Sequence, residues 1–311
     1  MLRAGLLWLS EQPRVFRMVR RNGLAKRFAK RFVAGETADG AVAALHELNT
    51  AGLLATVDLL GESVHRAEDA EAARDTYLRV LDRIRATKAD ANVSVKLTQM
   101  GLDVDEQLCV ANVRAIVARA AELGNFVRID MEGSAYTTRT LRLFTDVFLP
   151  EFGPDRVGVV LQSYLRRTAA DADAMIGLGA RVRLCKGAYN EPAEIAFPVK
   201  RDVDAQFLVC AERLLAKGRY PGIATHDEAI IAQVRAFAQR SGIARDQFEF
   251  QMLYGVRRDL QRSLRRDGYR MRVYVPFGDQ WYPYLMRRLA ERPANIAFVV
   301  GNLVKESFRR R

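Results

Sequence analysis

The sequence predicts an α/β protein, a (β/α)₈ TIM-like barrel preceded by a basic helical arm. Short β-prone runs recur eight times between residues 53 and 278, and each is followed by a stretch with helical periodicity. Strands that alternate with helices form a parallel sheet with right-handed crossovers. Eight such units over about 250 residues suit a closed barrel better than an open sheet. We therefore expect the arm at residues 1–50 and the barrel at residues 51–311.

The arm is the most basic part of the chain. Residues 14–32, RVFRMVRRNGLAKRFAKRF, place apolar side chains at helical spacing between Arg and Lys. We expect this amphipathic helix to pack on the barrel, and contact with an anionic lipid surface is the alternative. No run approaches the roughly 18 apolar residues of a membrane span, and residues 1–14 lack a signal-peptide core. The expected location is the cytoplasm, with peripheral contact at the inner face of the membrane as the alternative.

The predicted elements alternate along the rest of the chain. The eight predicted strands are residues 53–60, 91–98, 125–132, 156–163, 181–187, 222–227, 248–255 and 269–278. Helical stretches follow them, for example residues 106–124, 137–153 and 227–243, and several open on the acidic, Ser or Thr residues that helix starts prefer. The Gly-x-Gly of residues 177–179 follows a helix and precedes a strand, so it predicts a turn rather than a dinucleotide loop.

Charge and cysteine content limit the classes of function. A net charge of +12 and a pI near 9.9 favour an anionic partner: a nucleic acid, a membrane surface or an acidic ligand. The three cysteines have no CxxC spacing, and only three histidines accompany them. These numbers argue against a zinc site and against a disulfide framework, and they favour a reducing compartment.

Charged and polar residues recur at the predicted carboxyl ends of the strands, where barrel enzymes carry their catalytic groups. Taken alone, each has a structural explanation, such as a core histidine or a tyrosine that only packs. Buried charges must be paired or bound to a ligand, so their recurrence at one rim predicts a site for an anionic ligand. The candidates are Lys96, Asp130, Gln162, Arg183, Lys186, Thr225, His226 and Tyr274, whereas the seventh strand offers only the apolar Met252 and Leu253.

The predicted last helix adds two more cations. In YPYLMRRLAERP, residues 282–293, positions i, i+3 and i+4 place Tyr284, Arg287 and Arg288 on one helical face. An arginine pair is compatible with a solvated face. It is also compatible with a fork of guanidinium donors for a carboxylate or a phosphate.

Several motifs, in this order along the chain, resemble those of flavin-dependent proline dehydrogenases, most of all the monofunctional bacterial enzymes. They are RVRLCKGAY (181–189), ATHD (224–227), FEFQMLYG (248–255), RVYVPFG (272–278) and YLMRRLAE (284–291). The resemblance extends over roughly residues 50–300, and the Tyr-x-x-Arg-Arg-x-x-Glu helix is its most specific part. It implies a distorted (β/α)₈ barrel whose last helix binds substrate.

The resemblance also implies a reaction. Family members bind FAD non-covalently, oxidise L-proline to Δ1-pyrroline-5-carboxylate and pass electrons to a quinone, which is the first step of proline degradation to glutamate. Bifunctional relatives carry a second dehydrogenase domain, and some a DNA-binding domain. This chain is too short for either, so we expect a separate pyrroline-5-carboxylate dehydrogenase downstream and no nucleic-acid partner.

The same resemblance assigns roles to residues. Arg287, Arg288 and Lys96 would hold the proline carboxylate. Tyr274, Tyr284 and Leu253 would wall the ring. Asp130 would support this pocket through Tyr274, Arg183 would lie near the flavin N5, and Glu291 would restrain the arginines. The remaining FAD contacts would be Met131, Gln162, Lys186, Gly187, Ala188, Thr225 and His226.

Two other functions are weighed against this one. The first is a phosphate-handling barrel such as an aldolase, with Lys96 or Lys186 as the Schiff-base residue. The second is a basic nucleic-acid-binding protein, which would bind with a steep dependence on salt. The sequence offers neither a recognition helix nor an aromatic platform for single strands, which argues against the second.

Overall fold

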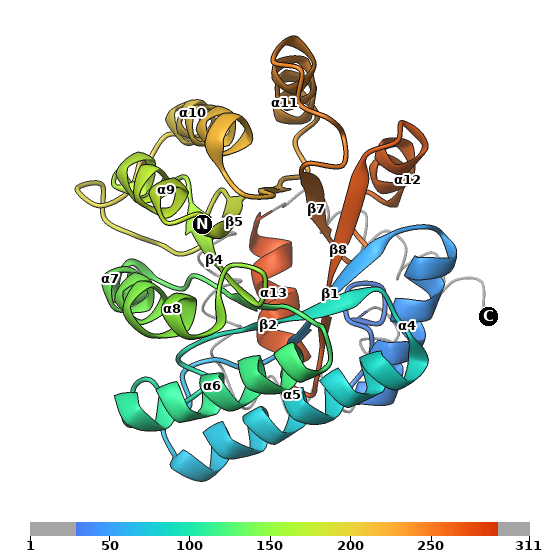
Figure 1. The fold of residues 1–311 in the computed structure, drawn as a ribbon, viewed down its shortest axis with the longest axis vertical. Helices are drawn as coiled ribbons and strands as arrows, with labels where there is room; N and C mark the ends of the chain where they lie inside the picture. Colours follow the sequence, from blue (N-terminus) through green and yellow to red (C-terminus); the bar gives the residue numbers. More distant parts are fainter. Residues whose placement is uncertain (1–28, 292–311) are drawn as a thin grey trace, which may run out of the picture.

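Eight parallel strands close into a barrel in the computed structural model, which describes residues 29–291 and their side chains as far as residue 286. The strands follow chain order around the ring, and β1 (Leu54–Leu59) pairs with β8 (Arg270–Phe277) to close it (Figure 1). Between them lie β2 (Ala91–Val95), β3 (Val127–Ile129), β4 (Val157–Gln162), β5 (Arg181–Cys185), β6 (Gly222–Ala224) and β7 (Glu249–Leu253). All eight strands fall within the predicted ranges, so the predicted (β/α)₈ barrel is confirmed.

Helices surround the ring, and α13 follows the end of β8 and overlaps the middle of the ring in the view of Figure 1. Side chains of Thr37, Asp105 and Asp227 cap α4, α6 and α11 by accepting hydrogen bonds from first-turn N–H groups. The helices are α4 (Ala38–Thr50), α5 (Ala67–Thr87), α6 (Glu106–Glu122), α7 (Ser134–Leu143), α8 (Leu149–Phe152), α9 (Thr168–Gly177), α10 (Lys200–Lys217), α11 (Glu228–Arg240), α12 (Arg258–Arg266) and α13 (Trp281–Glu291).

The helix predicted at residues 137–153 is not continuous. A π-helical turn, η1 (Phe144–Phe148), separates α7 from α8. Pro150 lies in the first turn of α8 and has no N–H to donate to the carbonyl of Asp146, where an α-helical ladder would continue. The sequence pattern shows the helical periodicity but not this extra residue in the ladder.

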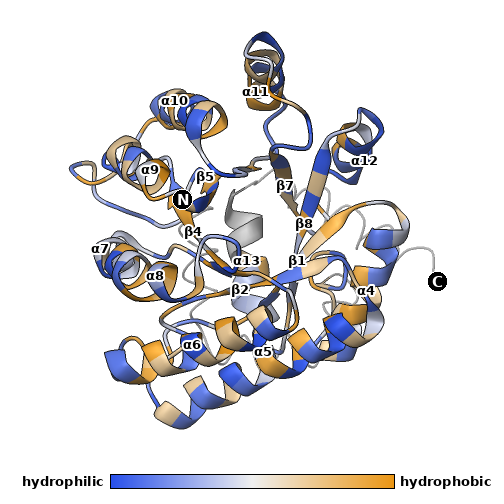
Figure 2. Cartoon of the chain, in the orientation of Figure 1, coloured by the Kyte–Doolittle hydropathy of each residue, from blue (hydrophilic) through white to orange (hydrophobic). Residues whose placement is uncertain are grey.

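The apolar core lies between the strands and the outer helices. Helix α5 buries Tyr77, Val80, Leu81 and Ile84, spaced three, four and seven residues apart, and its other faces are largely polar (Figure 2). Burying each aliphatic side chain contributes roughly 1.5–3 kcal/mol. One set of alternate strand residues therefore faces this core, and the other set faces the inside of the barrel.

Polar side chains occupy much of the barrel interior. Barrels of this class usually fill it with layers of Val, Ile and Leu. Here Arg183 of β5 donates to Ser94 of β2 across the barrel (3.2 Å), and Thr56 donates to Asn92 (2.7 Å). These four side chains are buried. Buried polar groups are hydrogen-bonded in folded proteins, so the barrel interior is a connected hydrogen-bond network rather than an apolar core.

The segment from residue 29 to residue 36 lies against α13. Ala34 N–H donates to the carbonyl of Pro276 (2.9 Å), and Trp281 Nε1 donates to Glu36 (3.1 Å). Ala29 and Val33 belong to one buried cluster with Trp281 and other residues of α13. This end of the predicted arm therefore packs on the barrel, and residues 1–28 lie outside the described part. Within that part, no helix is long and apolar enough to cross a membrane.

Gly255 gives a test of this packing. A Cβ at Gly255 would lie 1.8 Å from the carbonyl oxygen of Arg31, whereas a Cβ at Gly242 would meet nothing within 4 Å. Both glycines have positive φ, +75° and +66°, so alanine costs about 1–2 kcal/mol of backbone strain at either site. We expect Gly255→Ala to lose about 1–3 kcal/mol more than the matched control Gly242→Ala. Urea unfolding of the two variants measures the difference, and equal losses would contradict the packing.

Candidate active site

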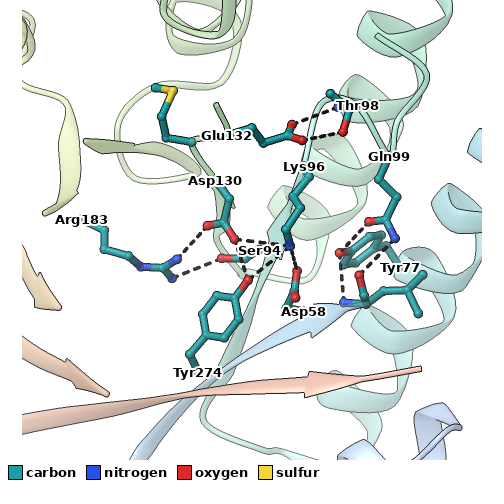
Figure 3. Close-up of polar contacts among 12 residues, drawn as sticks. Asp58, Tyr77, Ser94, Lys96, Thr98, Gln99, Asp130, Glu132, Arg183 and Tyr274 are labelled. Carbon is teal, nitrogen blue, oxygen red and sulfur yellow. Dashed lines mark hydrogen bonds and ion pairs between the residues drawn. The ribbon is translucent and has the colours of Figure 1, made fainter. Parts of the chain in front are cut away.

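Four side chains meet at the carboxyl ends of β1, β2, β3 and β8. Lys96 Nζ donates to Asp58 (2.6 Å) and lies 3.9 Å from Asp130. Tyr274 OH donates to the same Asp130 (2.6 Å) and lies 3.5 Å from Lys96 Nζ (Figure 3). Lys96 is therefore held between two carboxylates, and Asp130 links the lysine to the tyrosine.

Arg183 extends this group toward the centre of the barrel. Its Nη1 donates to Asp130 (2.7 Å), its Nη2 to Ser94 (3.2 Å) and its Nε to Gln251 (2.5 Å). The guanidinium carbon also lies 5.1 Å from the centre of the Tyr274 ring. A planar guanidinium with every nitrogen bonded has little freedom to turn, so the arginine is fixed before any ligand arrives.

Burial and charge set the protonation states here. Burial raises the pKa of Asp58 to about 6, although Lys96 opposes the shift. Burial alone would lower the pKa of Lys96, but Asp58 and Asp130 outweigh it and hold that pKa above its usual value. Burial and the Asp130 charge also raise the pKa of Tyr274 well above normal. At neutral pH the group therefore contains a protonated lysine and a protonated phenol.

A second layer fixes the strand ends that carry these groups. Glu132 accepts from the N–H and the hydroxyl of Thr98 (3.1 and 2.5 Å), in the turn after β2. Tyr77 of α5 accepts from Leu59 N–H (3.1 Å), and Gln99 donates to the Leu59 carbonyl (3.0 Å). Figure 3 shows these contacts beside the Lys96 group. They tie the end of β1 to the turn after β2, so the Lys96–Asp58 pair is set by backbone as well as charge.

At the end of β4, a buried amide lacks one partner. Gln162 is 4% exposed, and its Nε2 donates to the carbonyl of Met131 (3.2 Å). Its Oε1 has no hydrogen-bond partner among the described residues. An unpaired buried acceptor costs roughly 1–3 kcal/mol, so the site offers an acceptor that a donor on a ligand would satisfy.

The bend after β5 brings backbone close to a ring. Gly187 has φ +102°, and a Cβ there would lie 2.2 Å from the ring of Tyr164. Only glycine fits this position, and the exposed Ala188 follows it. Residue 187 therefore has no side chain where the backbone of residues 186–188 passes the Tyr164 ring at the rim of the barrel.

Lys186 belongs to an ion-pair group of its own. Its Nζ lies 2.6 Å from Asp204 and 3.0 Å from Asp227, and Lys200 contacts the same two carboxylates. Burial raises the pKa of Asp227, but hydrogen bonds and charge from the two lysines outweigh it and hold that pKa at about 2. Two carboxylates thus offset the charge of Lys186, which was predicted as part of one cationic rim.

The residues after β6 hold the neighbouring strand. His226 Nε2 accepts the N–H of Leu253 (2.9 Å), at the end of β7. Thr225 N–H donates to the carbonyl of Gln251 (3.1 Å), and the Thr225 hydroxyl accepts from Asp227 N–H (3.1 Å). Because Nε2 is an acceptor, a neutral His226 ring carries its proton on Nδ1.

Four predicted site residues thus form one bonded group: Lys96, Asp130, Arg183 and Tyr274. The others occupy the same end of the barrel as separate groups, and Tyr284 is buried in the cluster of α13 and residues 29–33. The predicted residues Arg287, Arg288 and Glu291 lie within α13, but their side chains fall outside the described part of the chain.

The sequence analysis missed Asp58, Ser94 and Gln251. Asp58 is an isolated acid near the end of the apolar run LLATVDLL, and Gln251 is an isolated amide inside FEFQMLYG. A polar residue in an otherwise apolar strand is the signal that indicates Lys96, and the same signal is present at Asp58 and Gln251. Ser94 gives no such signal, because a small hydroxyl fits either face of a strand.

Similar proteins share this fold and these motifs. The chain matches the sequence profile of the family described as proline dehydrogenase over residues 41–300. It is 41% identical over 306 residues to a proline dehydrogenase of Deinococcus radiodurans, covering 97% of this chain and 98% of that protein. Proline dehydrogenase 1 of Bacillus subtilis strain 168 is 40% identical over 306 residues, covering 98% of this chain and 100% of the relative. The crystal structure of proline utilization A from Bdellovibrio bacteriovorus, inactivated by N-propargylglycine, matches with a TM-score of 0.82 and 26% identity, over 96% of this chain and 39% of that one.

The raised pKa of Asp58 predicts a pH effect on stability. Its value of about 6 in the folded chain compares with an ordinary 3.8, so the stability it contributes is complete below pH 4 and is lost as the pH rises through 6. Between pH 5 and 7.5 the native protein should lose on the order of 1 kcal/mol of unfolding free energy that Asp58→Asn retains. Urea unfolding of both proteins at both pH values measures this. The same pH dependence in the two would show that Asp58 ionises normally.

Proposed function

The chain belongs to the proline dehydrogenase family, and we propose that it oxidises L-proline to Δ1-pyrroline-5-carboxylate with FAD as cofactor and a quinone as electron acceptor. It is an oxidoreductase, and proline oxidation is the first step of proline catabolism. One observation carries the mechanistic part of the proposal: the buried, fully bonded group of Lys96, Asp130, Arg183 and Tyr274 at the end of the barrel where such enzymes work.

The residues at the ends of β4 and β5 fit a flavin. The orphaned Gln162 Oε1 supplies a buried acceptor for an N–H on the ring edge. Arg183 supplies a fixed cation, which favours a reduced ring that carries negative charge. When bound, FAD supplies the acceptor for the hydride that leaves proline. The other residues that would hold it are Met131, Lys186, Gly187, Ala188, Thr225 and His226.

Charge balance supports a substrate clamp on α13. Lys96 and Arg183 are matched by Asp58 and Asp130, so this group alone has no excess positive charge for a carboxylate. Arg287 and Arg288 of α13 would supply the excess positive charge, and Lys96 would add a third hydrogen-bond donor. Glu291, one helical turn later, would restrain the arginines.

Shape and orientation complete the proposal for the substrate side. Proline offers a carboxylate on a small ring. Its position would therefore depend on the arginines that bind the carboxylate and on the side chains that surround the ring. Tyr274 would provide a wall, and its bond to Asp130 fixes the plane of that wall. Tyr284 and Leu253 would close the other sides.

The surroundings of Lys96 argue against its role as the Schiff-base lysine of an aldolase. A Schiff-base lysine must be available as a neutral amine. Lys96 is paired with Asp58 at 2.6 Å, and the carboxylates raise its pKa. The family assignment and this ion pair both favour a lysine that acts as a cation.

The proposal includes two partners and a location. A quinone in the membrane would reoxidise the flavin, which fits a cytoplasmic enzyme with peripheral contact at the inner face. The product is a cyclic imine that carries a carboxylate. A separate pyrroline-5-carboxylate dehydrogenase would oxidise it further to glutamate.

A spectrum tests cofactor and substrate together. The purified protein should be yellow, and L-proline added without air should bleach it because the flavin is reduced. N-propargylglycine inactivated the relative from Bdellovibrio bacteriovorus, so it should also abolish later bleaching by proline here. A yellow protein that ignores proline would move the substrate elsewhere. A colourless protein that stays inactive with added FAD would refute the cofactor.

The clamp is tested by Arg287→Ala and Arg288→Ala. Losing one charge-assisted contact costs roughly 1.5–3 kcal/mol, so each variant should raise the KM for proline by about 10-fold to 150-fold. The FAD absorbance should persist, because the clamp faces the substrate. Arg266→Ala, an exposed arginine on α12, is the control and should keep the native KM. An unchanged KM in both clamp variants would remove these arginines from the substrate site.

A further inference from the structure

A cavity lies at the opposite end of the barrel from the candidate active site. It has a volume of about 450 Å³, the size of a small-molecule site, and it lies where the strands begin. Residues at the starts of β2, β3, β5 and β7 line it, together with the carboxyl end of α5. Apart from Arg183, which reaches this cavity from inside the barrel, the groups assigned to proline and FAD cluster at the other end of the strands.

This cavity is strongly cationic. Six basic side chains line it against three acidic ones, Asp90, Asp155 and Glu249. Arg183 is paired with Asp130 outside the cavity, so the other five leave a formal excess of two positive charges. Asp155 also pairs with Arg219 on the surface (2.7 Å). The basic residues are Arg85, Lys88, Arg128, Arg181, Arg183 and Arg272.

The one buried acid in the cavity is already saturated. Glu249 accepts from Arg272 Nε (2.7 Å), Gln251 Nε2 (2.6 Å) and Tyr220 OH (3.1 Å). Burial raises its pKa, but Arg272 and the other donors outweigh this and hold that pKa at about 2. Glu249 is thus the counter-ion of Arg272, and Asp130 is that of Arg183.

Arg128 and Arg181 form no ion pair with an acid in the described part of the chain. Arg128 is 3% exposed; its Nη1 donates to the carbonyls of Val159 (3.3 Å) and Arg181 (2.5 Å). The Nε atoms of both arginines are buried and have no partner among the described residues. Both guanidiniums lie over the ring of Phe126, at 4.8 and 4.3 Å from its centre. Two like charges thus share one ring with no acid between them.

The backbone makes room for this arrangement. A Cβ on Gly158 would lie 2.6 Å from Arg128 Nη1 and 2.5 Å from the carbonyl of Arg181. Glycine at this strand position admits the guanidinium into the barrel. Keeping an unpaired cation in such a place is costly, and burial and the neighbouring arginines lower the pKa of Arg128 accordingly.

We propose that this cavity binds a small oxyanion of the phosphate class, with Arg128 and Arg181 as its counter-ions and Arg85 and Lys88 at its rim. Guanidinium groups match the geometry of phosphate oxygens and bind them with charge-assisted hydrogen bonds. The anion completes the charge balance of the barrel at its amino-terminal end. The ligand is free phosphate or the phosphate group of a small metabolite.

Thermal unfolding tests the proposal without any measurement of turnover. The holoenzyme is titrated with sodium phosphate, and sodium chloride keeps the ionic strength constant. A ligand that binds only the folded state should raise Tm, by about 5 °C at one hundred times its Kd. Glycerol 3-phosphate at equal concentrations distinguishes the two sources, because a metabolite site binds the ester more tightly than the free ion.

Matched variants locate the site. Arg181→Gln should abolish the rise in Tm. Arg270→Gln should keep it, because Arg270 lies over the neighbouring Tyr220 ring but does not line the cavity. If Arg181→Gln does not fold, the exposed rim variant Arg85→Gln should weaken the apparent Kd several-fold. An equal rise in chloride and phosphate, or a rise that survives in Arg181→Gln and Arg85→Gln, would overturn the proposal.

Discussion

The buried guanidinium of Arg183 is the group on which both ends of the barrel depend. It bonds Asp130 and Ser94 toward the carboxyl end of the strands and Gln251 toward the amino end. Asp130 continues to Tyr274, and Gln251 continues to Glu249. A charge removed from water costs several kcal/mol unless it is well paired, and these partners offset the cost of burying Arg183.

The polar interior therefore has a consequence for where ligands are expected. In a satisfied network, buried donors and acceptors without partners stand out. Apart from two threonine hydroxyls of α7, the unpaired buried side-chain atoms among the described residues are Gln162 Oε1 at one end and the Nε atoms of Arg128 and Arg181 at the other. Both proposed ligands, the flavin and the oxyanion, fall at these gaps in the network.

The sequence was sufficient to predict the strands and part of the site, and the reason is periodicity. Alternating apolar runs locate the strands, and the geometry of parallel barrels brings their carboxyl ends together, so Lys96, Asp130 and Tyr274 were predicted at one rim. Their partners depend on register: Asp58 is level with Ser94 only because β1 and β2 pair as they do. Registers and the charge excess of a cavity arise from three-dimensional packing, and no local pattern encodes them.

The contact between residues 29–36 and α13 also bears on how the protein is made. Glu36 and Trp281 are separated by 245 positions, and β1 must find β8 across a similar distance. Contacts so far apart in sequence form slowly, because a long loop must close before they stabilise anything. A chain emerging from the ribosome can form its βα units one by one, yet the proposed substrate-binding helix has its docking surface only once the first and last strands meet. Assembly of the proposed substrate site therefore depends on contacts between segments from opposite ends of the described chain.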